Sequence, residues 1–552
     1  MKQKKSVMYI FLQGAAALAV ILMLGLFPLY YQNNFIDMSN AKLAFFRVCS
    51  IGLVLAAVLF IAMDLLSQYK EGMQAKNKKA RNKNMQTKSQ AQLSKGEAFK
   101  VWLGSISVTT WFAVIFAAGV LVATIFSANP QESWQGMEGR KLGAVVWLLC
   151  IAMYGLIGKY LNAGKWTMWV FLAANTLVCL LAVLNFWKID PLGMYVNLSA
   201  DQHGGFISTI GNINACSSYL CMAVPVGMVI YATVKDLYLR ITSGIFLALG
   251  FCACYCTHSE SWMLGLIASF LVMLWFGLRG HNHMLRFLEV CGLFWVGSLL
   301  MKLMLIAGAA SGPTNLMYIY FMASKLQNGI MQNGYVLAAE GILIAAAWFF
   351  VWSRSKAGKK LPYRAIRKTI FIVLAVLAGI AVVAAIAANL HKGPWEGLFS
   401  ALERLRMQDL SGSGRGYIWR ITLESWLKMP LWDKITGYGV NYYHMFIQQY
   451  AGAGVSEFFG GALLVDAHNE LLQIISTMGL LGTIGYFGLL ISTAVKSAKG
   501  ISQKPFRLLG VVVVCSYMAQ GLVNNPTVFL TPYLFLMLGI IKSMEKTEDA
   551  GK

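Results

Sequence analysis

The sequence predicts an all-α, polytopic integral membrane protein with about 14 transmembrane helices and one large helical loop outside the membrane. Of its 552 residues, 58% are hydrophobic and only 12% are charged, and its mean hydropathy is +0.60. Soluble domains carry roughly a quarter charged residues. Apolar windows of about 20 residues, the length that a helix needs to cross a bilayer, recur along the chain. Short basic loops separate many of these windows, which is the pattern of a multi-pass protein.

The net charge of +23 is large enough for a nucleic-acid-binding protein, but its distribution indicates otherwise. The basic residues lie in loops next to apolar runs, so we expect membrane lipids and no nucleic acid as partners. Nearly all of the ten cysteines lie inside apolar runs, where a thiol behaves as a small hydrophobic group. Cys252, Cys254 and Cys256 are spaced by two, which scatters them around a helix, so packing is preferred to the alternative of a metal site.

The predicted spans follow one another from the N-terminus. Lys2, Lys4 and Lys5 precede an apolar run over 7–30 that is too long for a signal peptide and is interpreted as the first span. The remaining spans are predicted at 41–67, 101–125, 142–160, 166–187, 214–234, 241–257, 262–278, 287–306, 335–353, 369–389, 467–495, 508–524 and 530–543. The loop 68–100 contains nine Lys and Arg residues, which predicts a cytoplasmic location for it and for both termini.

These spans predict three parts: an N-terminal bundle over 1–389, an extracytoplasmic loop over 390–466 and C-terminal helices over 467–552. The loop is too long to lack secondary structure, so we expect two or three amphipathic helices on the membrane surface. Within the spans, Lys302 and Glu340 are predicted at similar depth. They are interpreted either as an ion pair or as the lining of a polar outer cavity.

The outer loop contains a candidate anion site. Ser413 is predicted to cap a helix over 414–428. One face of this helix carries Arg415, Trp419, Thr422 and Trp426. In the first helical turn the backbone N–H groups and the dipole favour an anion, and a guanidinium binds phosphate oxygens in bidentate fashion. The alternative is an interfacial helix whose arginine meets lipid headgroups and whose tryptophan anchors in the interface.

A candidate base follows at the start of the next span. His468 lies two residues after Asp466, which is the predicted N-cap. A histidine in a first helical turn is disfavoured as a cation, so its imidazole should stay neutral and basic near pH 7, with Asn469 and Glu470 holding its orientation. The alternative is a histidine without a chemical role at a membrane boundary.

Four motifs give these residues a context: Ser413-Gly414-Arg415-x-x-x-Trp419, Gly437-Tyr438-Gly439, His468-Asn469-x-x-Leu472-Gln473 followed by Gly479-Leu480-Leu481-Gly482, and Gly211-Asn212-Ile213-Asn214. With them the chain resembles the O-antigen ligase family, which includes bacterial polysaccharide polymerases and glycan-to-protein oligosaccharyltransferases. The similar region extends over about 205–495.

The resemblance implies a fold like that of the C-type glycosyltransferases and a metal-independent reaction without a cofactor. A glycan would be transferred or polymerised from a polyprenyl-pyrophosphate-linked donor to an acceptor hydroxyl, on a glycan or lipid, at the outer face of the cytoplasmic membrane. Arg415 would bind the pyrophosphate and His468 would activate the acceptor. Trp419, Tyr417 and Asn469 are further expected substrate-binding residues.

One position departs from the family pattern. Family members commonly carry an arginine, as a second pyrophosphate ligand, where this chain has Glu260 within Thr257-His258-Ser259-Glu260-Ser261. The candidates for a replacement are Arg420, Arg404, Arg406 and Arg140. Otherwise the donor is bound differently, or the activity is lost or changed.

Three functions therefore remain. A membrane glycosyltransferase is favoured over a carrier or flippase for a lipid-linked glycan, because a carrier keeps its polar residues at mid-membrane. In this chain the polar cluster lies in the outer loop. The third function is that of a catalytically silent relative.

Overall fold

A computed structural model of the chain describes residues 7–81, 106–310, 327, 329, 331, 333–391, 402 and 405–549. Within these residues the fold is all-α, as predicted. The strands β1 (Phe206–Ile207) and β2 (Gly211–Asn212) have two residues each and form one antiparallel pair. Every other element is helical.

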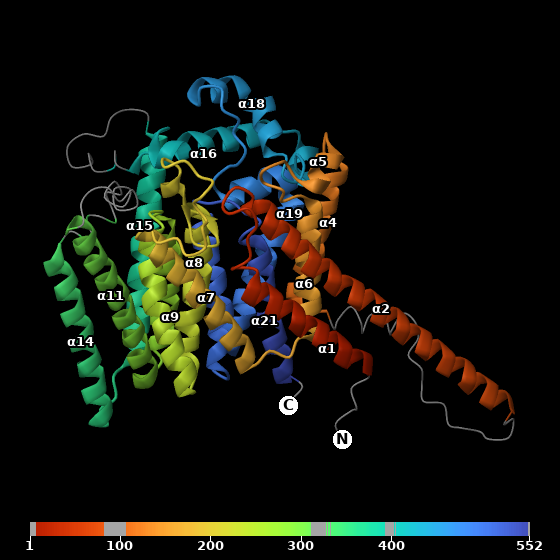
Figure 1. Cartoon of the computed structure of the whole chain (residues 1–552), viewed down its shortest axis with the longest axis horizontal. Coiled ribbons are helices and arrows are strands. Elements are labelled where there is room, and N and C mark those ends of the chain that lie inside the picture. Colours follow the sequence, from red (N-terminus) through yellow and green to blue (C-terminus); the bar gives the residue numbers. More distant parts are fainter. Residues whose placement is uncertain are drawn as a thin grey trace.

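The helices run in both directions through one bundle (Figure 1). In chain order they are α1 (Val7–Val20), η1 (Ile21–Leu26), α2 (Met38–Arg81), α4 (Val108–Ile125), α5 (Pro130–Gln135), α6 (Ala144–Tyr160), α7 (Lys165–Phe186), η2 (His203–Gly205), α8 (Ile213–Thr233), α9 (Leu237–Cys256), α10 (Ser261–Gly277), α11 (His281–Ala310), α14 (Gly334–Lys356), α15 (Tyr363–Leu390), α16 (Ser411–Lys428), α17 (Leu431–Thr436), α18 (Tyr443–Phe458), α19 (Glu470–Gly500), η4 (Pro505–Arg507), α20 (Leu508–Gly521) and α21 (Thr531–Asp549).

Within the described residues, 10 helices are long and apolar enough to cross a membrane. Four shorter apolar helices lie at Ala144–Tyr160, Ser261–Gly277, Pro505–Gly521 and Thr531–Met544. Each predicted span coincides with one helix of these two sets. The chain is thus a multi-pass membrane protein. The predicted basic loop 68–100 begins inside α2, and its residues from 82 onward lie outside the described part of the chain.

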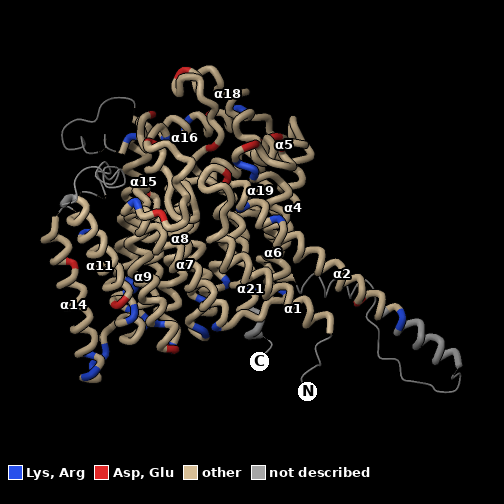
Figure 2. Tube along the Cα trace, viewed as in Figure 1, with Lys and Arg blue, Asp and Glu red and all other residues tan. Residues whose placement is uncertain are grey.

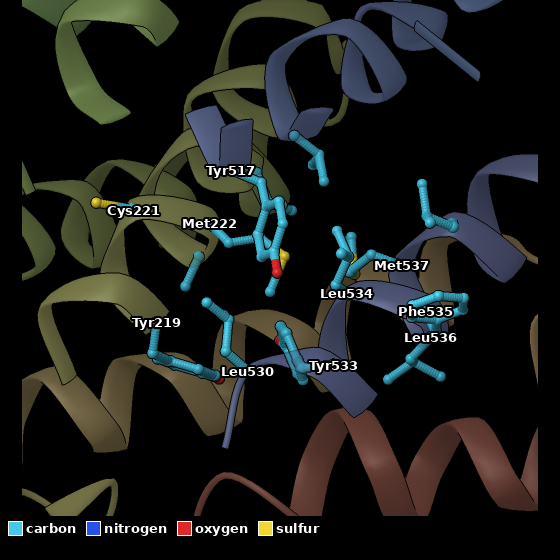
Figure 3. Packing of buried hydrophobic residues seen from close by; sticks show 14 of the residues in the cluster. Tyr219, Cys221, Met222, Tyr517, Leu530, Tyr533, Leu534, Phe535, Leu536 and Met537 are labelled. Carbon is cyan, nitrogen blue, oxygen red and sulfur yellow. The ribbon is translucent and has the colours of Figure 1, made fainter. Parts of the chain in front are cut away.

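The core lies around α8. In its most apolar window 89% of the residues are buried, and α8 packs against α9, α10 and α20. Aromatic side chains from distant segments meet there: Tyr219 of α8 lies 5.0 Å from Tyr533 of α21, ring centre to ring centre (Figure 3). The Tyr219 hydroxyl donates to the Asn175 side chain at 2.7 Å. Because apolar burial gives little advantage between helices in lipid, such packing and polar contacts hold the bundle together.

Glycines bring α4 and α19 together. A Cβ on Gly119 of α4 would lie 2.6 Å from the Cα of Gly482 on α19, so the two backbones touch. Gly485, one turn further along α19, packs equally closely against the backbone of Phe116. Small residues permit this approach between membrane helices. The motif Gly479-Leu480-Leu481-Gly482 is thereby explained, at least in part, by packing.

Charge separates the two ends of the bundle. Lys and Arg gather at the end where α14 finishes and α15 begins, whereas the opposite end carries both signs (Figure 2). Helices α16, α17 and α18 lie over this second end, and confirm that the predicted outer loop is helical (Figure 1). The start of α1 and the end of α21 both lie towards the basic end.

The ion pair predicted between Lys302 and Glu340 is not formed. The Lys302 ammonium donates to the carbonyl of Met331 at 2.6 Å. Glu340 instead lines an apolar cavity of about 860 Å³ between α10, α11 and α14. The two residues lie on neighbouring helices, but the Lys302 ammonium is hydrogen-bonded to a backbone carbonyl.

Candidate functional site

The first half of the candidate site is the start of α16. Residues Gly412, Ser413 and Gly414 have φ values of 60°, 60° and 87°, so a left-handed turn precedes the regular helix. The prediction that Ser413 caps the helix through its side chain is wrong: no side-chain cap is formed. Glycine adopts positive φ at little cost, which accounts for the glycines in this motif. Gly414 also packs closely, because a Cβ there would lie 3.3 Å from the ring of Phe459.

This turn places Arg415 at the beginning of the regular helix. Its Nη1 donates to the carbonyl of Gly412 at 3.0 Å. The Arg415 Nε and, one helical turn later, the Trp419 Nε1 are both buried and have no hydrogen-bond acceptor among the described residues. Burial lowers the pKa of Arg415, although guanidinium groups stay protonated in proteins. Two adjacent N–H donors without an acceptor suit the oxygens of an anionic ligand.

The second half of the site is the segment that leads into α19. Asp466 was predicted to be the N-cap of this helix, and that prediction is wrong. Asp466 is buried and forms an ion pair with Arg140, which lies between α5 and α6. Asn469 is the N-cap: its side-chain oxygen accepts from the Leu472 N–H at 3.0 Å. The N-cap lies three residues later than predicted because the Asp466 carboxylate contacts Arg140.

His468 lies between these two anchored residues with a φ of 46°, in the left-handed region. Burial lowers its pKa, and the nearby cations Arg415 and Arg140 lower it further, whereas Asp466 raises it. The net shift is downward, so the imidazole is neutral at pH 7. The ring has no hydrogen-bond partner within the described part of the chain. These interactions show that Arg415, Arg140 and His468, predicted separately, lie close together.

The two residues after His468 form hydrogen bonds that connect the start of α19 to α20. The Asn469 Nδ2 donates to the Leu522 carbonyl at 2.9 Å, which joins the cap of α19 to the end of α20. The buried Glu470 carboxylate accepts hydrogen bonds from Tyr486 and Tyr517, each at 2.6 Å. Asn469 and Glu470 were predicted to orient His468 directly. No bond from either side chain to the imidazole is present; both position the backbone that carries it.

Two glycines allow close packing of the helices α16 to α18, called the outer helices, against α19. Gly437, at the end of α17, has a φ of 87°, and a Cβ on it would lie 2.5 Å from the Gly479 nitrogen. Gly479 interrupts α19 with φ 62° and ψ −171°, a conformation that is essentially restricted to glycine. At this kink the N–H groups of Tyr438 and Gly439 donate to the Ser476 and Thr477 carbonyls, both at 3.0 Å. The second and third motifs therefore form one structural joint.

A cavity of about 20 Å³ lies behind the ion pair and is lined by Arg140, Asp466, Asn441, Thr477 and Asn525, among others. A volume of this size has room for one water molecule and not for a sugar ring.

The remaining predicted site residues have structural contacts. Tyr417 is buried and stacks on Phe458 of α18, with ring centres 4.1 Å apart. Arg420 forms ion pairs with Asp409 and Glu424 and lies over the Tyr417 ring.

Two further arginines were predicted as substitutes for the family's second pyrophosphate ligand. Arg406 donates to the carbonyls of Ala388 and His391 at the end of α15. It holds the C-terminus of that helix. Arg404 lies outside the described residues.

The two other motif positions lie at helix starts. Gly211 has a φ of 96°, and the Asn212 side chain caps α8 by accepting from the Asn214 and Ala215 N–H groups. The Gly211-Asn212-Ile213-Asn214 motif is therefore explained by the capping of α8. Glu260 is exposed at the N-cap position of α10. Its negative charge is therefore at the favourable end of a helix dipole.

Sequence reasoning missed the pairing of Arg140 with Asp466 and the contacts of Glu470 with two tyrosines. Neither had a local signal: Arg140 and Tyr517 come from segments far away in the chain, and Tyr486 lies 16 residues further along α19, beyond its kink. A contact of the His444 imidazole on α18 with the Glu132 carboxylate on α5, at 3.4 Å, was missed because these two helices are far apart in the chain. Together they join the α5 region to the outer helices.

A comparison with protein families finds a match over the part of the chain that contains this candidate site. Residues 331–487 match the family model described as O-antigen ligase. This region contains α16 to α18, Arg415, His468 and the joint at Gly479. No curated protein matches the chain. Residues 331–487 of this multi-pass membrane protein are thus similar to the O-antigen ligase family, and the match supports a role in glycan transfer in cell-surface polysaccharide assembly.

Proposed function

We propose that the chain transfers or polymerises a glycan from a polyprenyl-pyrophosphate-linked donor to an acceptor hydroxyl at the outer face of the cytoplasmic membrane. The observation that carries this proposal is the convergence of Arg415, Arg140 and a neutral His468 at one end of the bundle. Two cations suit a pyrophosphate, and a neutral imidazole suits the removal of a proton from a hydroxyl. The basic opposite end supports the proposed orientation, with both termini in the cytoplasm.

In the proposed reaction, the His468 imidazole accepts the proton of the acceptor hydroxyl. The hydroxyl oxygen then bonds to the anomeric carbon of the donor sugar, and the bond from this carbon to the pyrophosphate oxygen breaks. Arg415, with its unpaired Nε, stabilises the charge that develops on the leaving pyrophosphate. Trp419 adds a second N–H donor beside it.

Arg140 is the proposed replacement for the arginine that the family pattern places at Glu260. Its side chain remains 42% exposed although one nitrogen contacts Asp466, so part of the side chain is accessible to a ligand. Arg420 and Arg406 are engaged with other partners in the structure. We retain Trp419, Tyr417 and Asn469 as proposed parts of the site, the latter two as residues that position its backbone.

The test is to measure glycan transfer in membranes that contain variants of equal abundance. We expect Arg415→Lys and His468→Ala each to lower the transfer rate by at least about 100-fold, because a planar bidentate donor and a general base contribute on this order. Lipid-linked donor should accumulate on the outer side. Lys428→Ala is the matched control: it removes an exposed charge from the last turn of the same helix and should leave the rate unchanged.

Wild-type transfer rates in both variants would overturn the proposal. A fall of lipid-linked donor on the outer side in the His468 variant would favour the carrier or flippase instead. Inactivity of the wild-type chain with every lipid-linked glycan of the producing cell would favour a catalytically silent relative.

A further inference from the structure

A second charged site lies at the basic end of the bundle, opposite His468. A pocket of about 480 Å³ opens there between the end of α10, the starts of α11 and α15, and the end of α19. It is lined by Leu278, Arg279, His283, Tyr363, Arg364, Arg367, Ile501, Ser502 and Pro505. Neither the family assignment nor the proposed transfer reaction uses this pocket.

The pocket concentrates positive charge without a carboxylate among its described lining residues. Arg279 and Arg367 lie over the same Trp275 ring, with their guanidinium carbons 4.9 Å and 5.7 Å from its centre. Burial lowers the pKa of Arg279, and the nearby Arg367 cation lowers it further. Two guanidinium groups on one ring repel each other, and that repulsion is relieved by an anion bound between them.

The fold holds these arginines in place. The Arg279 Nη2 donates to the Ser502 hydroxyl at 2.9 Å, which links the α10–α11 turn to the end of α19. The buried Tyr363 bonds through its hydroxyl to the His281 Nδ1 at 2.8 Å, and the His281 Nε2 bonds to the Lys359 carbonyl at 3.0 Å. These contacts fix the starts of α11 and α15 against each other. The positive charge therefore surrounds a built pocket, whereas ordinary basic loops are solvated separately.

The pocket also borders a helix that the rest of the protein leaves uncovered. One of its walls is α15, a candidate span in whose most apolar window no residue is buried in the protein. Leu278, Ile501 and Pro505 add apolar surface beside the charges. A ligand that fits has a phosphate for the arginines and an apolar body that continues along α15, which describes a phospholipid and not a soluble anion.

We infer that this pocket binds the phosphate headgroup of an anionic phospholipid, with Arg279, Arg364 and Arg367 as its ligands. Basic pockets between membrane helices at the cytoplasmic side bind such headgroups in other membrane proteins. The lipid would bridge α10, α15 and α19, and α19 also carries the His468 end of the proposed active site.

The test is native mass spectrometry of the purified full chain in a neutral detergent, titrated with phosphatidylglycerol or phosphatidylcholine. We expect one phosphatidylglycerol to bind with clear preference over phosphatidylcholine. Arg364→Gln combined with Arg367→Gln should weaken it by roughly 30-fold, at about fivefold for each cation. The control pair, Arg354→Gln with Lys356→Gln, removes the same charge from the last turn of α14 at the same end and should change the affinity less than about threefold.

Arg364 is exposed, so Arg364→Gln alone provides a variant that preserves the fold if the double variant does not. Equal weakening in the site and control pairs would overturn the inference, because it would indicate general attraction to a basic surface. Saturation of the pocket by inorganic phosphate, with loss of phosphatidylglycerol binding, would overturn the lipid assignment in favour of a soluble phosphate ligand.

Discussion

At the scale of single residues, His468 combines an unusual backbone with an unusual charge environment. A histidine with a φ of 46° is in a sparsely populated conformation, which costs of the order of 1–3 kcal/mol. The contacts on both sides of it overcome this cost: the Ala467 N–H donates to the Gln473 side chain at 2.9 Å, and Asn469 is bonded to the end of α20. The backbone that carries the imidazole is thus held in place, and burial lowers the pKa of the ring.

This environment predicts the pH dependence of transfer. A base with a lowered pKa stays neutral, and therefore active, below the ordinary histidine value of about 6.5. The acid limb of the rate profile should accordingly lie below pH 6.5. Arg140→Gln should move this limb to higher pH, because it removes a cation that lowers the pKa of His468 and releases Asp466, which raises it.

The measurement is the initial transfer rate against pH in membrane vesicles, with Lys428→Gln as the unshifted control. An acid limb that stays in place in the Arg140 variant would contradict the assigned electrostatics. An acid limb at or above pH 6.5 in the wild-type chain would contradict the role of His468 as the titrating base.

At the scale of elements, the joint between α17 and the α19 kink connects the outer helices to the membrane bundle. Gly479→Ala should lower the free energy of unfolding by about 2 kcal/mol or more, because alanine is strained at φ 62° and ψ −171°. Its Cβ would also meet the Gly437 nitrogen at 2.5 Å. Gly379→Ala, in α15, is the matched control, since a Cβ there meets nothing within 4 Å.

The comparison is made by thermal denaturation of both variants in the same detergent. We expect a lower denaturation temperature for Gly479→Ala and an unchanged or slightly higher one for Gly379→Ala, because alanine favours helix. Equal temperatures would show that the joint carries no stability.

Elements also show where sequence reasoning succeeds and where it stops. The spans were predictable because each is a continuous apolar run, and Arg415 and His468 could be named as candidates because their motifs are local. The caps were not: Asp466 has the chemistry of an N-cap, but Arg140, on another helix, captures its carboxylate. Likewise Ser413 is a good cap in isolation, whereas the glycines on either side of it allow a left-handed turn. A local pattern fails where a distant residue or a backbone kink decides the geometry.

At the scale of the whole molecule, the separation of charge predicts the orientation in the membrane. Lys359, between α14 and α15, is exposed at the basic end, and Glu457 is exposed on α18 at the other. We expect Glu457→Cys to react with a membrane-impermeant maleimide in intact cells, and Lys359→Cys to react only after permeabilisation. The reverse pattern would place His468 in the cytoplasm and exclude the proposed lipid-linked donor on the outer face.

The way in which α19 is held has a consequence for the biosynthesis of the chain. A polypeptide is made from its N-terminus, so Arg415 and helices α16 to α18 are synthesised before α19 and α20. Only when α20 has been inserted can Asn469 donate its hydrogen bond to the Leu522 carbonyl and Tyr517 donate its hydrogen bond to Glu470. These two bonds position the backbone that carries His468. A nascent or truncated chain that ends before residue 517 therefore lacks these two contacts, and the proposed active site is completed only as synthesis nears its end.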